Sequence, residues 1–191
     1  MVGTSAPYAS HIIFLFLGGF IIATAIQRWA LDKRIALAIL RNIGNSPSHI
    51  VGGFMLATAC LSAFISNTAT TAMMLPIGLS VITILLLDKG KMNAADKNNS
   101  QTFATCIMLS IAYAANIGGI STVIGTAPNL FAVSFIRNAI DTSYQQDISF
   151  LEWSKIGVPI VLILLPVCWW LLTKILYKVD RFKLHHSLKT L

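Results

Sequence analysis

The feature that most constrains this chain is where its charged residues are missing. Asp, Glu, Lys and Arg are absent from four long stretches, residues 1–27, 42–87, 98–136 and 156–173. Each stretch is close to or longer than the roughly 18–20 apolar residues that cross a bilayer. A soluble helical protein needs charged faces on its helices, and these stretches offer none. We therefore expect an all-α polytopic membrane protein in the cell membrane, in contact with the lipid bilayer.

The positive charge of the chain has a topological explanation. Its net charge is +7, but Lys and Arg lie in short segments between apolar runs, where they orient membrane proteins. No nucleic-acid-binding motif accompanies them, so we expect no nucleic acid partner. Cys60, Cys106 and Cys168 are isolated within apolar runs. We interpret them as packing residues, and as neither a disulfide framework nor a metal site.

The pattern of apolar runs and polar breaks predicts one membrane domain over residues 1–191. An amphipathic pattern with Trp29 as an anchor follows the first run, which is typical of a helix lying at the membrane interface. The domain is expected to consist of a span at 11–27, an interfacial arm helix at 28–42, a re-entrant hairpin at 49–87, a discontinuous helix at 102–137 and a span at 156–177.

The re-entrant hairpin follows from the positive-inside rule. If every apolar run crossed the membrane once, the lysines of 88–97 and the basic tail at 174–189 would lie outside. If 49–87 instead enters and leaves on one side, these segments and 28–41 are all cytoplasmic. The run is also too long for one crossing at 1.5 Å per residue. We therefore predict a turn near its middle, at 66–71.

Both interruptions of the apolar runs carry small polar residues. The turn reads "SNTATTAMMLPI" at 66–77, and "NIGGISTVIGTAPN" at 116–129 is rich in residues that break a helix. The second interruption divides the discontinuous helix into expected pieces at 103–117 and 129–137. A turn at membrane depth must be buried in protein or line a watery cavity, because lipid cannot pair its backbone groups.

The chemical groups in these two interruptions are suited to binding a cation and an anion. A hard cation would be held there by carbonyl, hydroxyl and amide oxygens, since no charged side chain is present. An anion would be held by hydroxyl, amide and backbone N–H groups at helix N-termini. A proton relay would need an intramembrane carboxylate or His, which neither interruption provides. The structural alternative is that the polar residues only cap buried helices and that Gly and Pro only kink them.

The motifs resemble the divalent anion/sodium symporter family. The resemblance rests on "ISNTATTAMMLPI" at 65–77, "YAANIGGISTVIGTAPNL" at 113–130 and "PYASHIIFLFLGGFIIATAIQRWALDKRIAL" at 7–37. It implies sodium-coupled symport of a dicarboxylate, citrate or sulfate by an elevator mechanism, in a homodimer. It also implies an inverted-repeat unit that contains a re-entrant helical hairpin and a discontinuous transmembrane helix, with 11–27 and 156–177 as scaffold.

The resemblance also implies a role for individual residues. The Ser-Asn-Thr tip and a serine one turn before it match sodium and substrate ligands, and the loop at 125–129 matches the segment that closes the sodium site. Because the Ser-Asn-Thr motif occurs once, we expect the N-terminal repeat only, a fragment of a transporter. The expected sodium ligands are Ser62, Ser66, Asn67, Gly125 and Ala127, the expected substrate ligands are Asn67, Thr68 and Thr126, and the supporting loop residues are Pro128 and Asn129.

Other functions remain open on the sequence alone. A related Na⁺/H⁺ or arsenite-type carrier would share the hairpin design, and a non-transporting membrane assembly subunit would share the composition. An intramembrane hydrolase is disfavoured because Ser66 has no neighbouring His or Lys in the sequence to act as a base. We therefore expect no enzyme activity and no cofactor, with Na⁺ as the coupling ion and no other metal.

Overall fold

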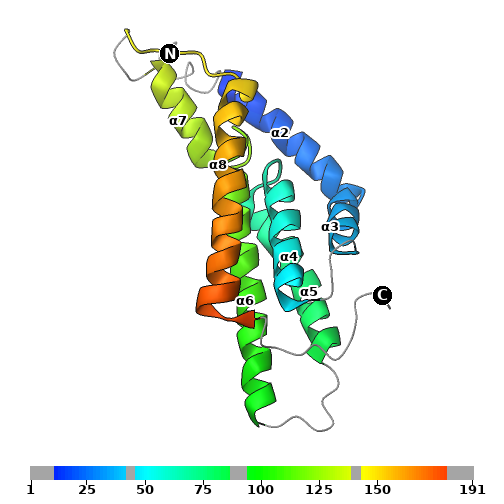
Figure 1. Cartoon of the computed structure of the whole chain (residues 1–191). Coiled ribbons are helices and arrows are strands. Elements are labelled where there is room, and N and C mark those ends of the chain that lie inside the picture. Colours follow the sequence, from blue (N-terminus) through cyan, green and yellow to red (C-terminus); the bar gives the residue numbers. More distant parts are fainter. Residues whose placement is uncertain (1–10, 42–45, 87–93, 139–142, 180–191) are drawn as a thin grey trace.

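The computed structural model describes residues 11–41, 46–86, 94–138 and 143–179, and every regular element in this part of the chain is helical. In chain order (Figure 1) the elements are α2 (His11–Arg28), α3 (Leu31–Arg41), α4 (Pro47–Ser62), α5 (Asn67–Leu86), α6 (Ala94–Gly119), α7 (Ala127–Asn138), α8 (Phe150–Trp170) and a π-helical segment, η3 (Leu171–Leu176).

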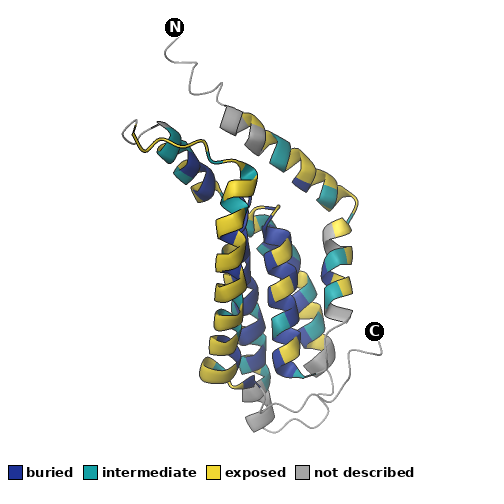
Figure 2. Cartoon of the chain, turned by 45° about the horizontal axis from the view of Figure 1, so that its top comes forward, coloured by how far each residue is buried: buried dark blue, intermediate teal, exposed yellow. Residues whose placement is uncertain are grey.

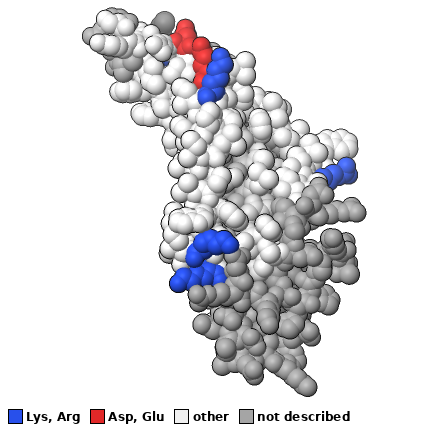
Figure 3. Space-filling view, in the orientation of Figure 1, with Lys and Arg blue, Asp and Glu red and all other residues white. Residues whose placement is uncertain are grey.

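Two helical segments of the described chain are long and apolar enough to cross a membrane, Ser100–Gly119 of α6 and Phe150–Leu176 of α8 and η3. Figure 3 shows a wide uncharged surface that separates the acidic residues at one end from basic residues nearer the other end. This distribution agrees with the gaps between charges in the sequence. The outer face of α8 is exposed along its length (Figure 2), with side chains such as Leu162 and Ile163 about two-thirds exposed.

Helices α4 and α5 form a hairpin whose turn is residues 63–66. Helix α4 begins where the side chain of Ser46 accepts a hydrogen bond from the His49 N–H, and Pro47 occupies the first helical position. Helix α5 begins after Ser66, whose Oγ accepts a hydrogen bond from the Ala69 N–H at 3.3 Å.

The core lies between α4, α5 and α6. Its largest fully buried side chains come from all three helices. Helices α4 and α6 approach closely because Gly118 lies against the backbone of Ala59, where a Cβ atom would overlap. Such contact between helix backbones is typical of small residues in membrane helices. The buried side chains that fill this core are Phe54, Met55, Met74, Phe103, Ile107 and Ile111.

Helix boundaries differ from the sequence expectation at two places. Helix α6 begins at Ala94, eight residues before the expected start of the discontinuous helix at residue 102. The arm expected at 28–42 is α3 preceded by a turn at Trp29 and Ala30, where Ala30 takes a left-handed conformation with φ of 49°. Residue 42 lies outside the described residues.

Prolines interrupt the helices less than the sequence suggests. Pro76 lies inside α5, and Pro159 and Pro166 lie inside α8. The interruption in the 102–137 region runs from residue 120 to 126, and Pro128 falls in the first turn of α7, where its missing N–H has no helical partner to lose. The helix therefore breaks at the Gly-, Ser- and Thr-rich part of the segment.

Candidate functional site

The site lies where the hairpin turn meets the interruption between α6 and α7. In Figure 1 the end of α4, the start of α5, the end of α6 and the start of α7 converge. The hydroxyl of Thr122, in the interruption, donates a hydrogen bond to the carbonyl of Ala63 at the end of α4. This bond satisfies one of the carbonyls that a helix C-terminus leaves unpaired. Two helix C-termini and two helix N-termini thus meet in one place.

Ser62 is at the centre of this junction and is fully buried. Its Oγ lies 2.8 Å from Oδ1 of Asn67 and 2.7 Å from the backbone oxygen of Ala115. A serine hydroxyl has one proton, so it can donate to only one of these two acceptors at a time. Oδ1 of Asn67 and the Ala115 oxygen therefore compete for this proton, and the oxygen that does not receive it has a lone pair available to a cation.

The side-chain amide of Asn67 is held at both of its ends. Oδ1 faces Ser62, and Nδ2 donates to Oδ1 of Asn116 at 3.1 Å. Asn116 in turn donates from Nδ2 to the carbonyl of Ala112, one helical turn earlier in α6, at 2.9 Å. The first residue of α5 is thereby tied to the last turn of α6.

Two glycines bring the interruption up to Asn67. A Cβ atom on Gly119 would overlap Oδ1 of Asn67, so a larger residue there would displace the Asn67 side chain. Gly125 in turn lies against Gly119, where a Cβ atom would come 2.5 Å from the Gly119 oxygen. Gly119 therefore lies between Gly125 and Asn67, and Asn67 is hydrogen-bonded to Ser62.

Asn129 joins the two sides of the interruption. Its buried Nδ2 donates to the carbonyl of Gly119 at 2.8 Å and to that of Thr122 at 2.7 Å. An amide nitrogen carries two protons, so both hydrogen bonds can form together. The side chain replaces helical backbone hydrogen bonds that the interruption removes.

Helix α8 contacts the site and the base of the hairpin through two tryptophans. Nε1 of Trp153 donates to the carbonyl of Ile120 at 2.9 Å, and Nε1 of Trp169 donates to the carbonyl of Ser48 at 2.8 Å. Gly157 lets α8 approach the interruption, since a Cβ atom there would come 2.5 Å from the Ile120 oxygen. The unwound backbone is therefore paired by side chains from α7 and α8.

The structure brings some of the expected ligands together and leaves others at the rim. Ser62, Asn67 and Gly125 lie in one cluster. Ser66 is exposed and caps α5. The remaining expected ligands make no hydrogen bond to Ser62 or Asn67 in the part of the chain that the structure describes. They are Thr68 and Ala127, which are exposed in the first turns of α5 and α7, and Thr126, which is half-buried just before α7. The supporting loop residue Pro128 is also exposed, in the first turn of α7.

Sequence reasoning missed Asn116, Thr122 and Trp153. Asn116 and Thr122 lie within the quoted motif at 113–130, and both are polar residues in a run without charges, which was the available signal. Trp153 gave no such signal, because only the packing of α8 against the interruption brings its indole N–H to Ile120.

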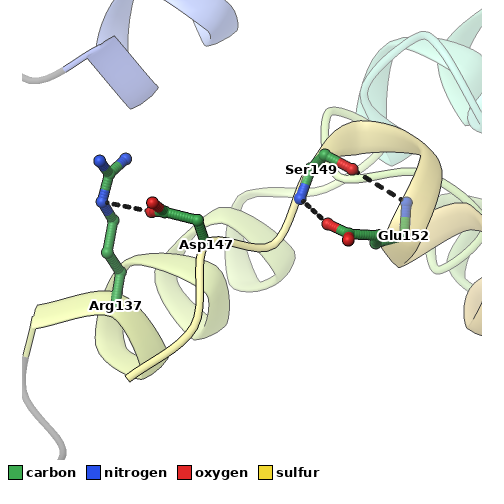
Figure 4. A network of polar contacts seen from close by, with 4 residues as sticks. All are labelled: Arg137, Asp147, Ser149 and Glu152. Atoms are coloured by element: carbon green, nitrogen blue, oxygen red, sulfur yellow. Dashed lines mark hydrogen bonds and ion pairs between the residues drawn. The ribbon is translucent and has the colours of Figure 1, made fainter. Parts of the chain in front are cut away.

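A second polar network lies away from the site (Figure 4). Nε of Arg137 at the end of α7 pairs with Oδ1 of Asp147 at 2.9 Å. Ser149 and Glu152 form a reciprocal capping box at the start of α8, with the Ser149 N–H donating to Oε2 of Glu152 at 2.7 Å. These contacts link the end of α7 to Asp147 and cap the start of α8, and they contribute no group to the Ser62 cluster.

The donor set indicates which ligands the site suits. Within the described residues, no group of three or more His, Cys, Asp or Glu could hold a metal ion. The Ser62 cluster provides hydroxyl, amide and carbonyl oxygens, which are the ligands that hard cations prefer. The N-termini of α5 and α7 provide the positive ends of two helix dipoles, which favour an anion.

Comparison with known proteins identifies the family. The chain is 40% identical over 187 residues to the sodium-dependent dicarboxylate transporter SdcS of Staphylococcus saprophyticus subsp. saprophyticus, covering 98% of this chain and 34% of that protein. It is 41% identical over 180 residues to SdcS of Staphylococcus aureus, covering 92% of this chain and 33% of the relative. The chain thus spans about a third of the length of these bacterial transporters.

The resemblance that the motifs indicated is confirmed by these relatives and by the profile of a transporter family. That profile, described as citrate transporter, matches residues 1–188. The chain belongs to the CitMHS citrate transporter family.

Proposed function

We propose that this chain forms part of a sodium-coupled symporter for a dicarboxylate or citrate in the cell membrane. The names of its relatives and its family support this substrate class. Neither mentions sulfate, so we propose organic anions in preference to sulfate. The homodimer that the resemblance implies stays a prediction.

The observation that carries the proposal is the shared proton of Ser62. Its hydroxyl faces Oδ1 of Asn67 and the Ala115 carbonyl at hydrogen-bond distance, and can satisfy one of them. A Na⁺ ion beside Ser62 and Asn67 would compensate the oxygen that receives no proton. Ser62 is buried, Asn67 is half-buried and neither is charged, so the cation would be held by uncharged oxygens alone.

The substrate would bind on the exposed side of the same junction. Thr68 in the first turn of α5 and Thr126 just before α7 carry hydroxyls that can donate to a carboxylate. The amide nitrogen of Asn67 has a second proton besides the one it donates to Asn116. Na⁺ on one side of Asn67 and a carboxylate on the other would stabilise each other, which is the physical basis of coupling.

Three observations support a re-entrant hairpin. Helix α4 has 16 residues and is about 24 Å long, which is shorter than the roughly 30 Å hydrocarbon core. The interruption beside its tip packs on Gly157, about 10 Å along α8 from Phe150, so it lies within the depth of the candidate span. The carbonyls of residues 63, 119, 120 and 122 are paired by side chains, as lipid would require.

Helix α8 is better placed to move with the site than to serve as scaffold. The resemblance implied a scaffold role for 156–177. However, Trp153, Gly157 and Trp169 tie α8 to both the interruption and the hairpin base. We propose that α4 to α8 move together as one body of an elevator.

The test is uptake of labelled succinate and citrate by cells that express the protein. Uptake should require an inward Na⁺ gradient, and Asn67→Ala should abolish it at normal expression, because the substitution removes both a Na⁺ ligand and a carboxylate donor. Cys60→Ala, on an exposed position of the same hairpin, is the matched control and should transport normally.

Several outcomes would contradict the proposal. Uptake that depends on a pH gradient with Na⁺ absent would indicate a proton-coupled or antiport mechanism. Uptake of sulfate in place of either carboxylate would overturn the substrate class. Unchanged Na⁺-dependent uptake by Asn67→Ala would overturn the site. A protein that transports none of these anions and binds no Na⁺ would be an assembly subunit.

A further inference from the structure

We infer that Asn116 is a positioning residue that determines which end of the Asn67 side-chain amide faces the cation. The inference rests on the proposed Na⁺ site, and it concerns a residue that makes no contact with Ser62. Asparagine presents an oxygen on one side and an NH₂ group on the other, and the two groups have nearly the same shape. A cation is attracted by the oxygen and repelled by the NH₂ group, so the orientation of this amide decides whether the site can bind Na⁺.

The orientation is fixed by a chain of hydrogen bonds that begins at a backbone carbonyl. The Ala112 oxygen can only accept, so the Asn116 atom that faces it at 2.9 Å must be the nitrogen. The oxygen of Asn116 then faces Asn67. The atom of Asn67 that lies 3.1 Å from that oxygen must likewise be a nitrogen, which leaves the Asn67 oxygen facing Ser62.

The other neighbours of Asn67 cannot set this orientation. The Ser62 hydroxyl can donate or accept, so it would tolerate either end of the amide. Gly119 restricts the space around Asn67 Oδ1 but offers no side chain to distinguish oxygen from nitrogen. Both partners of the Asn67 side chain face a backbone carbonyl, but the Ser62 hydroxyl can turn its proton towards either Ala115 or Asn67. The Asn116 amide must keep its nitrogen towards Ala112 and so presents its oxygen to Asn67.

A purely structural role is the alternative. The bond from Asn116 to Ala112 runs from residue i to the carbonyl of i−4, as polar side chains in helices often do. Thr105 makes the same kind of bond on the same helix, to the carbonyl of Gln101 at 2.9 Å. Thr105→Val is therefore a matched control that removes such a bond about 16 Å away along α6.

The experiment measures Na⁺-dependent stabilisation of the purified protein in detergent. The Tm is followed against Na⁺ concentration, with choline at constant ionic strength, and gives the Na⁺ concentration for half-maximal stabilisation. Asn116→Leu should raise that concentration about tenfold, because one hydrogen bond no longer favours the correct orientation. Thr105→Val should leave it within twofold of the wild-type value.

A double-mutant cycle separates orientation from structure. In Asn67→Asp, both side-chain atoms that replace the amide are oxygens, so the ligand no longer depends on which way it is turned. Adding Asn116→Leu to this variant should then cost no Na⁺ affinity. If the role of Asn116 were only structural, Asn116→Leu would lower the Na⁺ affinity by the same factor in the wild-type and Asn67→Asp backgrounds.

A conservative variant keeps the inference testable if Asn116→Leu does not fold. Asn116→Asp retains an oxygen towards Asn67, and it should bind Na⁺ at least as tightly as the wild type. Weaker Na⁺ binding by Asn116→Asp, unchanged binding by Asn116→Leu, or an equal loss in both backgrounds of the cycle would overturn the inference while the Na⁺ site stands. Absence of any Na⁺ effect on the wild-type protein would instead overturn the proposed function, and the inference with it.

Discussion

At the scale of single residues, the site depends on close approach between uncharged groups. Ser62 and Asn67 come from the two sides of the hairpin turn, and Ala115 and Gly119 come from the end of α6. Partial charges on amides and carbonyls are weak, so they act on an ion only at short range. Each atom that enforces or prevents this approach therefore affects binding strongly.

Gly119→Ala tests this dependence. The new Cβ atom would overlap Oδ1 of Asn67, so Asn67 must move away from Ser62. We expect a destabilisation of about 1–3 kcal/mol by overpacking, and loss of Na⁺-dependent stabilisation. Thermal unfolding with and without Na⁺ measures both effects.

Gly18→Ala is the matched control, because a Cβ atom on Gly18 in α2 meets no atom within 4 Å. It should unfold like the wild type and keep its response to Na⁺. A Gly119→Ala protein that responds to Na⁺ as the wild type does would contradict the placement of Asn67.

At the scale of helices, the interruption between α6 and α7 is held by side chains in place of helical hydrogen bonds. Asn129 pairs the Gly119 and Thr122 carbonyls, and Trp153 pairs that of Ile120. An unpaired carbonyl in an apolar setting costs about 1–3 kcal/mol, so each of these bonds stabilises the open segment. These bonds therefore hold the segment in a non-helical conformation. The helix ends on either side of it remain available to ligands.

Trp153→Phe should loosen this segment without removing the aromatic ring. The Ile120 carbonyl would lose its donor, and we expect amide hydrogen exchange within residues 120–126 to increase roughly tenfold. Mass spectrometry of peptides that cover the segment measures the change.

Trp170→Phe provides the comparison on the same helix, since Trp170 is 52% exposed. It should leave exchange in the segment unchanged. Equal exchange in both variants would show that the indole bond of Trp153 contributes nothing to the order of the interruption.

At the scale of the whole molecule, charge and helix length together favour a hairpin that returns to the side it entered. Lys174 and Lys178 follow the end of α8, whereas Asp147 and Glu152 lie at its start. Figure 3 shows the acidic residues at one end, with a basic side chain beside them, and an uncharged surface between that end and the other basic residues in view. The positive-inside rule places the Lys174 end in the cytoplasm.

Labelling of single cysteines tests this topology. In a background without Cys60, Cys106 and Cys168, a membrane-impermeant maleimide should label Tyr144→Cys in intact cells. Lys178→Cys should react only after the cells are permeabilised, because it lies beyond the other end of α8.

The positions before and after the hairpin decide between re-entry and a single crossing. Arg34→Cys and Lys89→Cys should both react only after permeabilisation, like Lys178→Cys. Reaction of Lys89→Cys in intact cells, with Arg34→Cys protected, would mean that residues 49–87 cross the membrane once.

The sequence by itself determined the class of the protein, because the absence of charge over long stretches excludes a water-exposed helix and needs no knowledge of packing. It also indicated where the helices break, since Gly and small polar residues act locally on the backbone, whereas Pro76, Pro159 and Pro166 are accommodated inside helices. Only the tertiary structure decided which polar groups meet. Ser62 and Ala115, or Trp153 and Ile120, are distant in the chain and are joined by the packing of α4, α6 and α8. Helical spacing cannot show such a contact, because it depends on how closely two backbones approach, as Gly118 and Gly157 permit here.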